Sequence, residues 1–149
     1  MTFKQEIYKS YHCIIQDKIQ LFQNTLNELK ESISNETKST AGDKHETALA
    51  MLQIEQENTN QQLKEAMKQK ALFVKIDPSV STSIIFTGSL VKTNKGYLFL
   101  SIALGKTKVD GIEVIALSHY SPLGQKLVGL KVNDSAEING IHYIIEGIV

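Results

Sequence analysis

The sequence predicts an α+β protein in which a long antiparallel helical hairpin precedes a small β-rich domain. Apolar residues of the first half recur at spacings of three and four, which is typical of one helix face. Apolar residues of the second half come in short runs bounded by turn residues, which is typical of strands. Both prolines and eight of the nine glycines also lie after residue 70. We therefore expect two domains, residues 1–70 and residues 71–149.

The first long helix is predicted over residues 2–34. Its spacing is close to a heptad pattern, with Lys18 or Ile19 filling the one gap. At about 1.5 Å per residue, a helix of roughly 32 residues extends about 48 Å. The predicted buried face consists of Tyr8, Tyr11, Ile15, Phe22, Leu26, Leu29 and Ile33.

A second helix is predicted over residues 43–69, after a polar stretch at 34–42 that favours a turn. Each helix has only one apolar face to bury, so the two helices should pack against each other in antiparallel directions. The tip of this hairpin is expected at residues 39–46. The predicted buried face of the second helix consists of Ala48, Leu52, Thr59, Leu63 and Ala66.

Five strands and one helix are predicted in the second half. Asn139-Gly140 favours a tight hairpin between residues 135–138 and the last apolar run. Ser121 is a suitable N-cap and Pro122 suits the first position of a short helix that Gly129 can end. The predicted strands are Ala71–Ile76, Ser83–Val91, Gly96–Leu104, Ile112–Leu117 and Ile141–Val149.

The composition argues against several classes of function. Sixteen lysines balance sixteen acidic residues and there is no arginine, so no overall basic field favours autonomous DNA binding. Cys13 is the only cysteine, which excludes an intramolecular disulfide and a cysteine-rich zinc site. No apolar run reaches the roughly 18 residues of a membrane-spanning helix. We expect a cytoplasmic protein that does not interact with membranes.

Two segments carry recognisable motifs: residues 118–129 followed by Asn133-Asp134, and residues 42–48. The first resembles the C-terminal sequence S-x-x-S-P, with its short apolar helix, of the bacterial Gre-type transcript-cleavage factors. The second is similar to that family's G-D-x-x-E-N-A tip, with Asp43 and Glu46 on its two acidic positions. The resemblance covers nearly the whole chain and implies an FKBP-like fold for residues 71–149. The family positions in the C-terminal motif are Ser121, Pro122, Leu123 and Gly124, for which we expect mainly a structural role.

The resemblance also implies a function. The β-rich domain would dock at the rim of the RNA polymerase secondary channel, and the hairpin tip would reach the catalytic centre. There Asp43 and Glu46 would help to hold a Mg²⁺ ion shared with the polymerase, so that the backtracked 3′ end of the nascent RNA is hydrolysed. The polymerase remains the enzyme. Mg²⁺ prefers hard oxygen ligands, and two carboxylates alone form an open site, so the free protein should bind the ion weakly.

Several alternatives remain open. Asp43 and Glu46 are also spaced as a helix capping box. Thr47, Leu49 and Ala50 replace residues common in the family, which favours a channel-binding regulator that does not stimulate cleavage. A coiled-coil adaptor for some other protein is a third interpretation.

The residues outside these motifs are expected to be structural. His45 is predicted to be a solvated tip residue rather than a metal ligand, and Cys13 a buried or partly buried one. The aromatic residues of the second half could line a proline-binding pocket, but core packing is the favoured interpretation. These aromatic residues are Phe86, Tyr97, Phe99, Tyr120 and Tyr143.

Overall fold

A computed structural model describes residues 1–38 and 43–149, apart from the side chains of Asp43 and Lys44. The chain divides by its contacts into two units. The hairpin unit comprises Ile14–Lys70, and the sheet unit comprises Met1–Cys13 together with Ala71–Val149. The predicted fold class, a helical hairpin followed by a β-rich part with one helix, is confirmed. The first residues of the chain belong to the sheet unit, although the helical pattern runs through them without a break.

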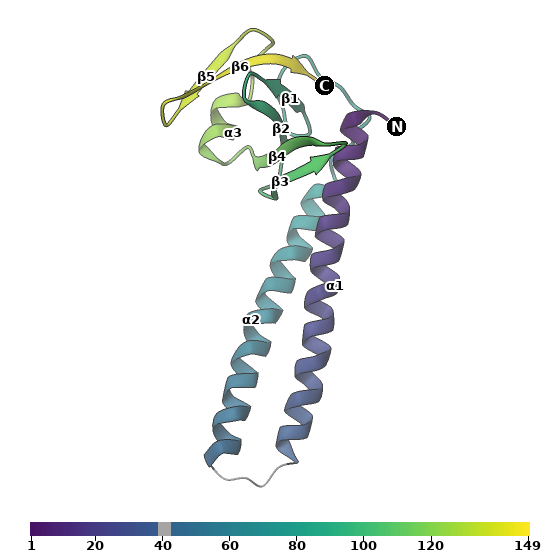
Figure 1. The fold of residues 1–149 in the computed structure, drawn as a ribbon, viewed down its shortest axis with the longest axis vertical. Coiled ribbons are helices and arrows are strands. Elements are labelled where there is room, and N and C mark those ends of the chain that lie inside the picture. Colours follow the sequence, from purple (N-terminus) through teal and green to yellow (C-terminus); the bar gives the residue numbers. More distant parts are fainter. Residues whose placement is uncertain (39–42) are drawn as a thin grey trace. The chain divides into compact units, whose positions relative to one another are not determined.

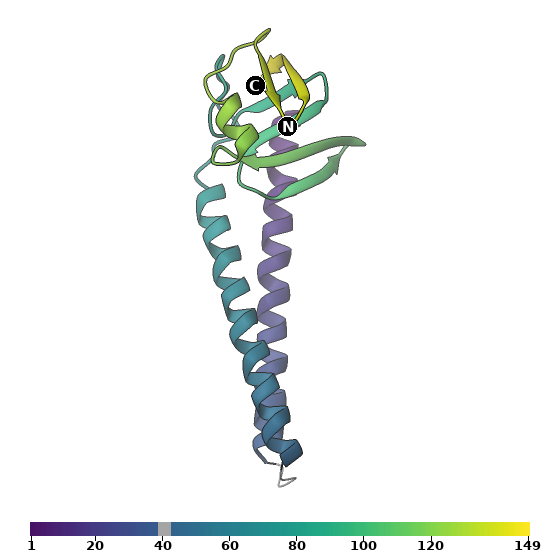
Figure 2. The ribbon, with the colours of Figure 1, turned by 90° about the vertical axis from the view of Figure 1, so that its left-hand side faces the viewer.

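Two long helices form the hairpin unit, α1 at Phe3–Thr37 and α2 at Asp43–Phe73. Within this unit they lie side by side (Figures 1 and 2). The Lys18 Nζ atom lies 3.4 Å from Gln69 Oε1, while Glu36 lies against His45 at the other end, so the helices run antiparallel as predicted. The predicted faces of both helices are at least partly buried, and Ile19 rather than Lys18 fills the gap in the α1 pattern.

The sheet unit is built on a six-stranded mixed sheet with the order β3-β4-β2-β1-β6-β5. All neighbouring strands are antiparallel except β2 and β4, which are parallel. The short helix α3, at Pro122–Leu127, follows β4 and supplies Leu127 to the core. The strands are β1 at Leu90–Thr93, β2 at Gly96–Ser101, β3 at Gly105–Val109, β4 at Ile112–Ser118, β5 at Ser135–Ile138 and β6 at Ile141–Ile148.

Two strand predictions were wrong and one strand was missed. Residues 71–76 do not form a strand, because α2 continues to Phe73, which is fully buried seven residues after Ala66 on the same helix face. In the run 83–91 only the last residues join β1. Strand β3 was missed because its sequence Gly-Lys-Thr-Lys-Val is mostly polar and buries only Val109.

The run 83–89 forms a loop with its own pairing. The Ile85 N–H group donates to Leu130 O at 2.9 Å, and Gly129 N–H donates to Ile85 O at 2.9 Å. Gly88 has a φ of 99°, which an extended strand cannot accommodate. Ile85 therefore enters the core from a loop. The apolar residues that surround it in the sequence are why this run was predicted to be a strand.

The first turns of α1 are fixed to the rest of the sheet unit by Tyr11. Its hydroxyl lies 2.7 Å from Gly105 O and 3.0 Å from Val114 O, and its ring stacks with Phe99 at a centroid distance of 6.2 Å. Burial of the side chain raises the pKa of Tyr11 to about 12. This one residue therefore links the start of α1 to strands β3 and β4. Of the helices in the described ranges, none combines the length and apolar character needed to cross a membrane.

Candidate functional site

The candidate tip lies where α1 ends at Thr37 and α2 begins at Asp43. Residues 39–42 and the Asp43 side chain are outside the described part of the chain, so the carboxylate pair can be assessed only at Glu46. Glu46 is exposed in the first turn of α2. Among the described side chains, its carboxylate has no hydrogen-bond or ion-pair partner. The start of α2 agrees with the prediction for this helix, and Asp43 is its first residue.

His45 connects the two helices beside this acidic residue. Its Nδ1 atom lies 3.3 Å from Glu36 Oε1, and the two side chains are 20% and 28% exposed. His45 was predicted to be a solvated tip residue, but its side chain is mostly buried against Glu36. Successive helical residues differ by about 100° around the axis, so a His45 turned toward α1 leaves Glu46 turned away from the contact between the helices.

Glu36 is not among the residues predicted to form the site. It lies seven residues after Leu29 and three after Ile33, on the same face of α1. A polar residue that continues an apolar face, opposite a histidine on the partner helix, is the pattern that would have indicated this pair. Among the described side chains, those of residues 1–38 and 45–149, no group of three or more His, Cys, Asp or Glu is placed to hold a metal ion.

The second motif forms the turn between β4 and α3. Ser121 is the N-cap of α3 as predicted, with its Oγ atom accepting from Gly124 N–H at 3.0 Å. The same hydroxyl donates to Ser118 O at 2.6 Å. Pro122 occupies the start of the helix, where its missing N–H group leaves no hydrogen bond unmade.

Gly124 is required by the close approach of the chain to itself. A Cβ atom at this position would lie 2.0 Å from Ser118 O and 2.9 Å from His119 Cα, both atoms of the backbone. Leu123 packs against the core of the sheet unit. These contacts belong to a rigid turn, and they fix the path of residues 118–120.

The five aromatic residues predicted to pack in the core differ in burial. Phe99 is fully buried, as predicted, and Tyr97 and Tyr143 are partly buried. The prediction of core packing was wrong for Phe86 and Tyr120, which are 62% and 77% exposed. Both lie outside strands, Phe86 in the 83–89 loop and Tyr120 in the turn before α3, where the alternation of buried and exposed residues no longer applies. Cys13 is also exposed, contrary to the prediction.

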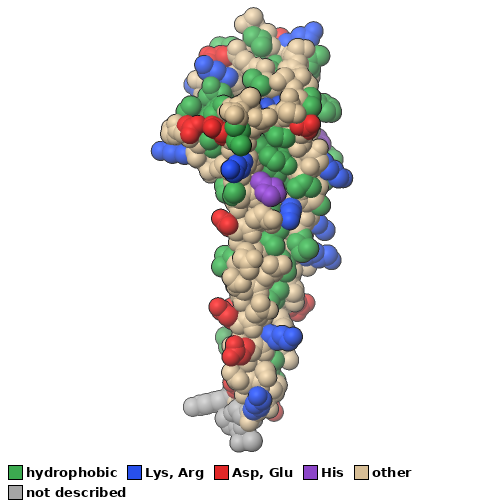
Figure 3. All heavy atoms as spheres, turned by 90° about the vertical axis from the view of Figure 1, so that its right-hand side faces the viewer, with side chains coloured by type: hydrophobic (Ala, Val, Ile, Leu, Met, Phe, Trp, Pro, Cys, Tyr) green, Lys and Arg blue, Asp and Glu red, His purple; other side chains and the backbone are tan. Residues whose placement is uncertain are grey.

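Charges of both signs are distributed over the hairpin unit. On the face drawn in Figure 3, the described Lys, Asp and Glu side chains of this unit are scattered without an extended patch of one sign. Direct attraction to a nucleic-acid backbone is therefore not favoured on that face.

Comparisons with known proteins give a similarity in structure but no match to a family model or a curated protein. A solved structure described as "Structure of the transcription factor Gfh1" is similar to this chain over 92% of each of the two chains. The sequences are 13% identical in that alignment, and the TM-score is 0.37.

Proposed function

We propose that this protein is a Gre-type accessory factor of RNA polymerase, which inserts its hairpin into the secondary channel and stimulates cleavage of backtracked RNA by the polymerase. The observation that carries this proposal is an exposed carboxylate without a described partner, Glu46, in the first turn of the second helix of a long hairpin. The acidic tip sequence from Gly42 to Ala48 and the Ser-Pro-Leu-Gly turn support it.

The tip is suited to contribute part of a metal site. Asp43 and Glu46 would each offer carboxylate oxygens, and the polymerase would supply the remaining ligands. Bound there, Mg²⁺ would supply Lewis acidity and lower the pKa of a coordinated water. Side chains three residues apart on a helix lie next to each other on one face, so the two carboxylates can bind the same ion.

The pair of His45 and Glu36 supports this role mechanically. A carboxylate that must enter another protein's active centre needs a defined position, because a displacement of about 1 Å can cost roughly 100-fold in rate. The contact between His45 and Glu36 fixes the start of α2 against the end of α1 without using Glu46. The Glu46 carboxylate therefore stays available for the partner.

The test is a cleavage assay on stalled complexes. Purified chain is added with Mg²⁺ to polymerase that has been backtracked by a defined number of nucleotides, and RNA shortening is followed over time. The proposal requires faster release of short 3′ fragments than polymerase alone gives. A matched Glu57→Gln variant, which changes an exposed carboxylate further along α2, should act like the unchanged protein.

A second candidate is a channel-binding regulator without cleavage activity. It is favoured by Leu49, which is partly buried in the hairpin where the family commonly has an acidic residue. The same assay distinguishes the two functions, because such a regulator would slow nucleotide addition and leave cleavage unchanged. Failure to bind polymerase at all would favour the adaptor interpretation instead.

A further inference from the structure

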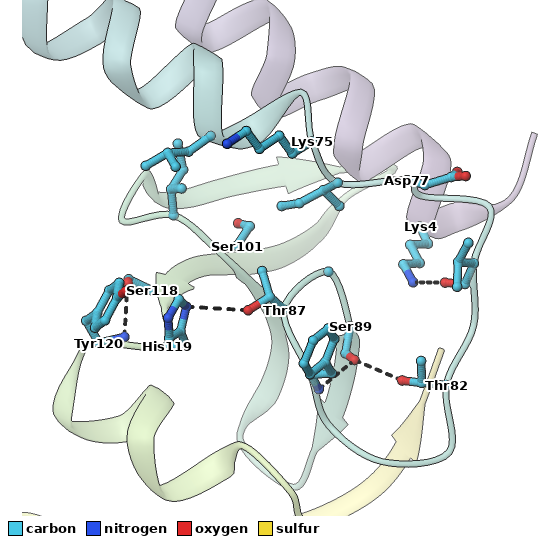
Figure 4. Close-up of a pocket in the computed structure, with 16 residues that line it drawn as sticks. Lys4, Lys75, Asp77, Thr82, Thr87, Ser89, Ser101, Ser118, His119 and Tyr120 are labelled. Carbon is cyan, nitrogen blue, oxygen red and sulfur yellow. Dashed lines mark hydrogen bonds between the residues drawn. The ribbon is translucent and has the colours of Figure 1, made fainter.

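The sheet unit contains a pocket of about 560 Å³ that has no part in the role proposed for the hairpin tip. Its walls come from the first turn of α1, the loop between α2 and β1, the end of β2 and the turn after β4 (Figure 4). The rigid turn built by Ser121 and Gly124 fixes one wall, because it positions Ser118, His119 and Tyr120. The pocket volume lies within the range of roughly 300 to 1,000 Å³ typical of small-molecule sites.

The lining is mainly apolar and its apolar groups are open to solvent. Leu72, Val80, Phe86 and Tyr120 all contribute to the pocket and are 54% to 77% exposed. Exposed apolar area costs about 25 cal/mol per Å² relative to burial, so a ligand that covers these side chains gains favourable free energy. A grouping of this kind on a small protein indicates a binding surface.

One cation at this pocket has no described partner. Among the described side chains, the Lys75 ammonium group makes no hydrogen bond and no ion pair. The Asp77 carboxylate does not neutralise it, because it accepts from Ser79 N–H at 2.9 Å and Ser79 Oγ at 2.6 Å. Figure 4 shows the Asp77 carboxylate on the opposite side from the Lys75 ammonium group.

Lys4, the other lysine of the lining, is already engaged. Its ammonium group donates to Val80 O at 2.6 Å and to Val149 O at 2.9 Å. Burial lowers the pKa of Lys4, an effect that the Asp77 charge opposes. Lys75 is therefore the cation that a ligand in this pocket can pair with.

The Ser101 hydroxyl group lies between Lys75 and His119 in the view of Figure 4. Ser101 is buried, and its hydroxyl donates to Phe99 O over a long distance of 3.4 Å. An apolar side chain from a partner protein that entered the pocket would offer no acceptor to the Lys75 ammonium group or to this hydroxyl. A carboxylate offers acceptors to both groups while an attached hydrocarbon covers the apolar walls.

We propose that this pocket binds a small amphipathic carboxylic acid, with its carboxylate at Lys75 and Ser101 and its apolar body against Val80, Phe86 and Tyr120. The inference is independent of the function proposed for the hairpin tip. It names a ligand class by charge and shape, one anionic head on a compact hydrocarbon.

The test uses calorimetric titration of the whole chain with octanoate, octanol and octylammonium, below their aggregation concentrations. The expected result is saturable binding of one octanoate, about three- to tenfold tighter than octanol, with octylammonium weaker than both. Equal affinity for octanoate and octanol would overturn the assignment of Lys75 as the head-group site. No saturable binding of octanoate would overturn the whole proposal and leave the apolar surface to a protein partner.

Variants locate the site. Lys75→Gln should weaken octanoate binding about three- to tenfold and leave octanol unchanged. Lys108→Gln, which alters an exposed lysine of β3 outside the pocket, should change neither affinity. Phe86→Ala should weaken the binding of both octanoate and octanol. Because the Phe86 side chain is 62% exposed, the substitution should not impair folding. Equal effects of the two lysine variants would contradict the proposal, and thermal unfolding of each variant verifies that it is folded.

Discussion

His45 Nδ1 lies 3.3 Å from Glu36 Oε1 and joins the beginning of α2 to the end of α1. The contact lies at the point where the hairpin reverses direction, and its two side chains come from positions nine residues apart. It orders the helix ends next to Glu46 while leaving that carboxylate exposed.

The contact between His45 and Glu36 should contribute modestly to stability. We expect a double-mutant cycle with His45→Ala and Glu36→Ala to give a coupling free energy of about 0.2–1 kcal/mol, because both side chains remain partly exposed and the pair is screened by solvent. Urea unfolding of the four proteins measures it. A coupling near zero would mean that the pair does not order the tip.

Tyr11 should matter more for the stability of the sheet unit. Tyr11→Phe removes a buried hydroxyl that lies within hydrogen-bond distance of Gly105 O and Val114 O. We therefore expect a loss of about 1–3 kcal/mol in the free energy of unfolding. Urea unfolding at neutral pH measures this loss, and an unchanged midpoint would contradict the structural role of the hydroxyl.

The pKa of Tyr11 predicts a dependence on alkaline pH. Burial raises the pKa of Tyr11 to about 12, above its usual value of 10.0, so the folded state keeps the phenolic proton to higher pH than the unfolded state. The stabilising contribution is complete below pH 10 and is lost as the pH rises toward 12. Unfolding followed between pH 9 and 12 should show a steeper loss of stability than the Tyr11→Phe variant shows, in proteins compared at matched salt.

Gly124 should be intolerant of any side chain. The backbone of Ser118 and His119 cannot move away as a flexible side chain can, so Gly124→Ala should destabilise the protein by about 2–4 kcal/mol. Gly147→Ala is the matched control. Its added Cβ would meet only Lys92 Cβ at 3.8 Å, so its stability should change by less than about 1 kcal/mol. Similar melting temperatures for the two variants would contradict the close approach at Gly124.

Glu6 and Asp110 should make the sheet unit sensitive to pH in the acidic range. A hydrogen bond with Asp110, followed by the repulsion of its charge, raises the pKa of Glu6. The folded state then binds a proton more tightly than the unfolded state, so stability falls as the pH rises through the titration of Glu6. Glu6→Gln should reduce the dependence of the free energy of unfolding on pH. If urea unfolding of this variant between pH 4 and 7 shows the same dependence as the unchanged protein, other groups are responsible for it.

The helices were predictable because their information is local and repeated. Each turn of α1 and α2 places another apolar residue on the same face, so the pattern survives single exceptions such as Thr59. The strand pattern is short, and two of its predictions failed. Ile85 reaches the core from a loop whose backbone partners, Gly129 and Leu130, lie more than forty residues later, and no local pattern shows such a pairing.

The site was predictable only in part for the same reason. The acidic tip positions and the Ser-Pro-Leu-Gly turn are contiguous in the sequence, so motifs identify them. The pocket near Lys75 combines residues from Lys4 to Tyr120 that meet only after folding. The prediction that its aromatic residues pack in the core was wrong, because a sequence pattern does not show whether a side chain on a loop faces the core or the solvent.

The most direct test of the account is stimulation of RNA cleavage by the Asp43→Asn, Glu46→Gln double variant on backtracked RNA polymerase at fixed Mg²⁺ concentration. Both amides can still cap a helix, but neither replaces an anionic Mg²⁺ ligand. The account predicts an unchanged melting temperature, retained binding to polymerase and at least a tenfold loss of stimulated cleavage, corresponding to about 1.4 kcal/mol or more in the barrier. Full cleavage by the folded, polymerase-bound double variant would contradict it.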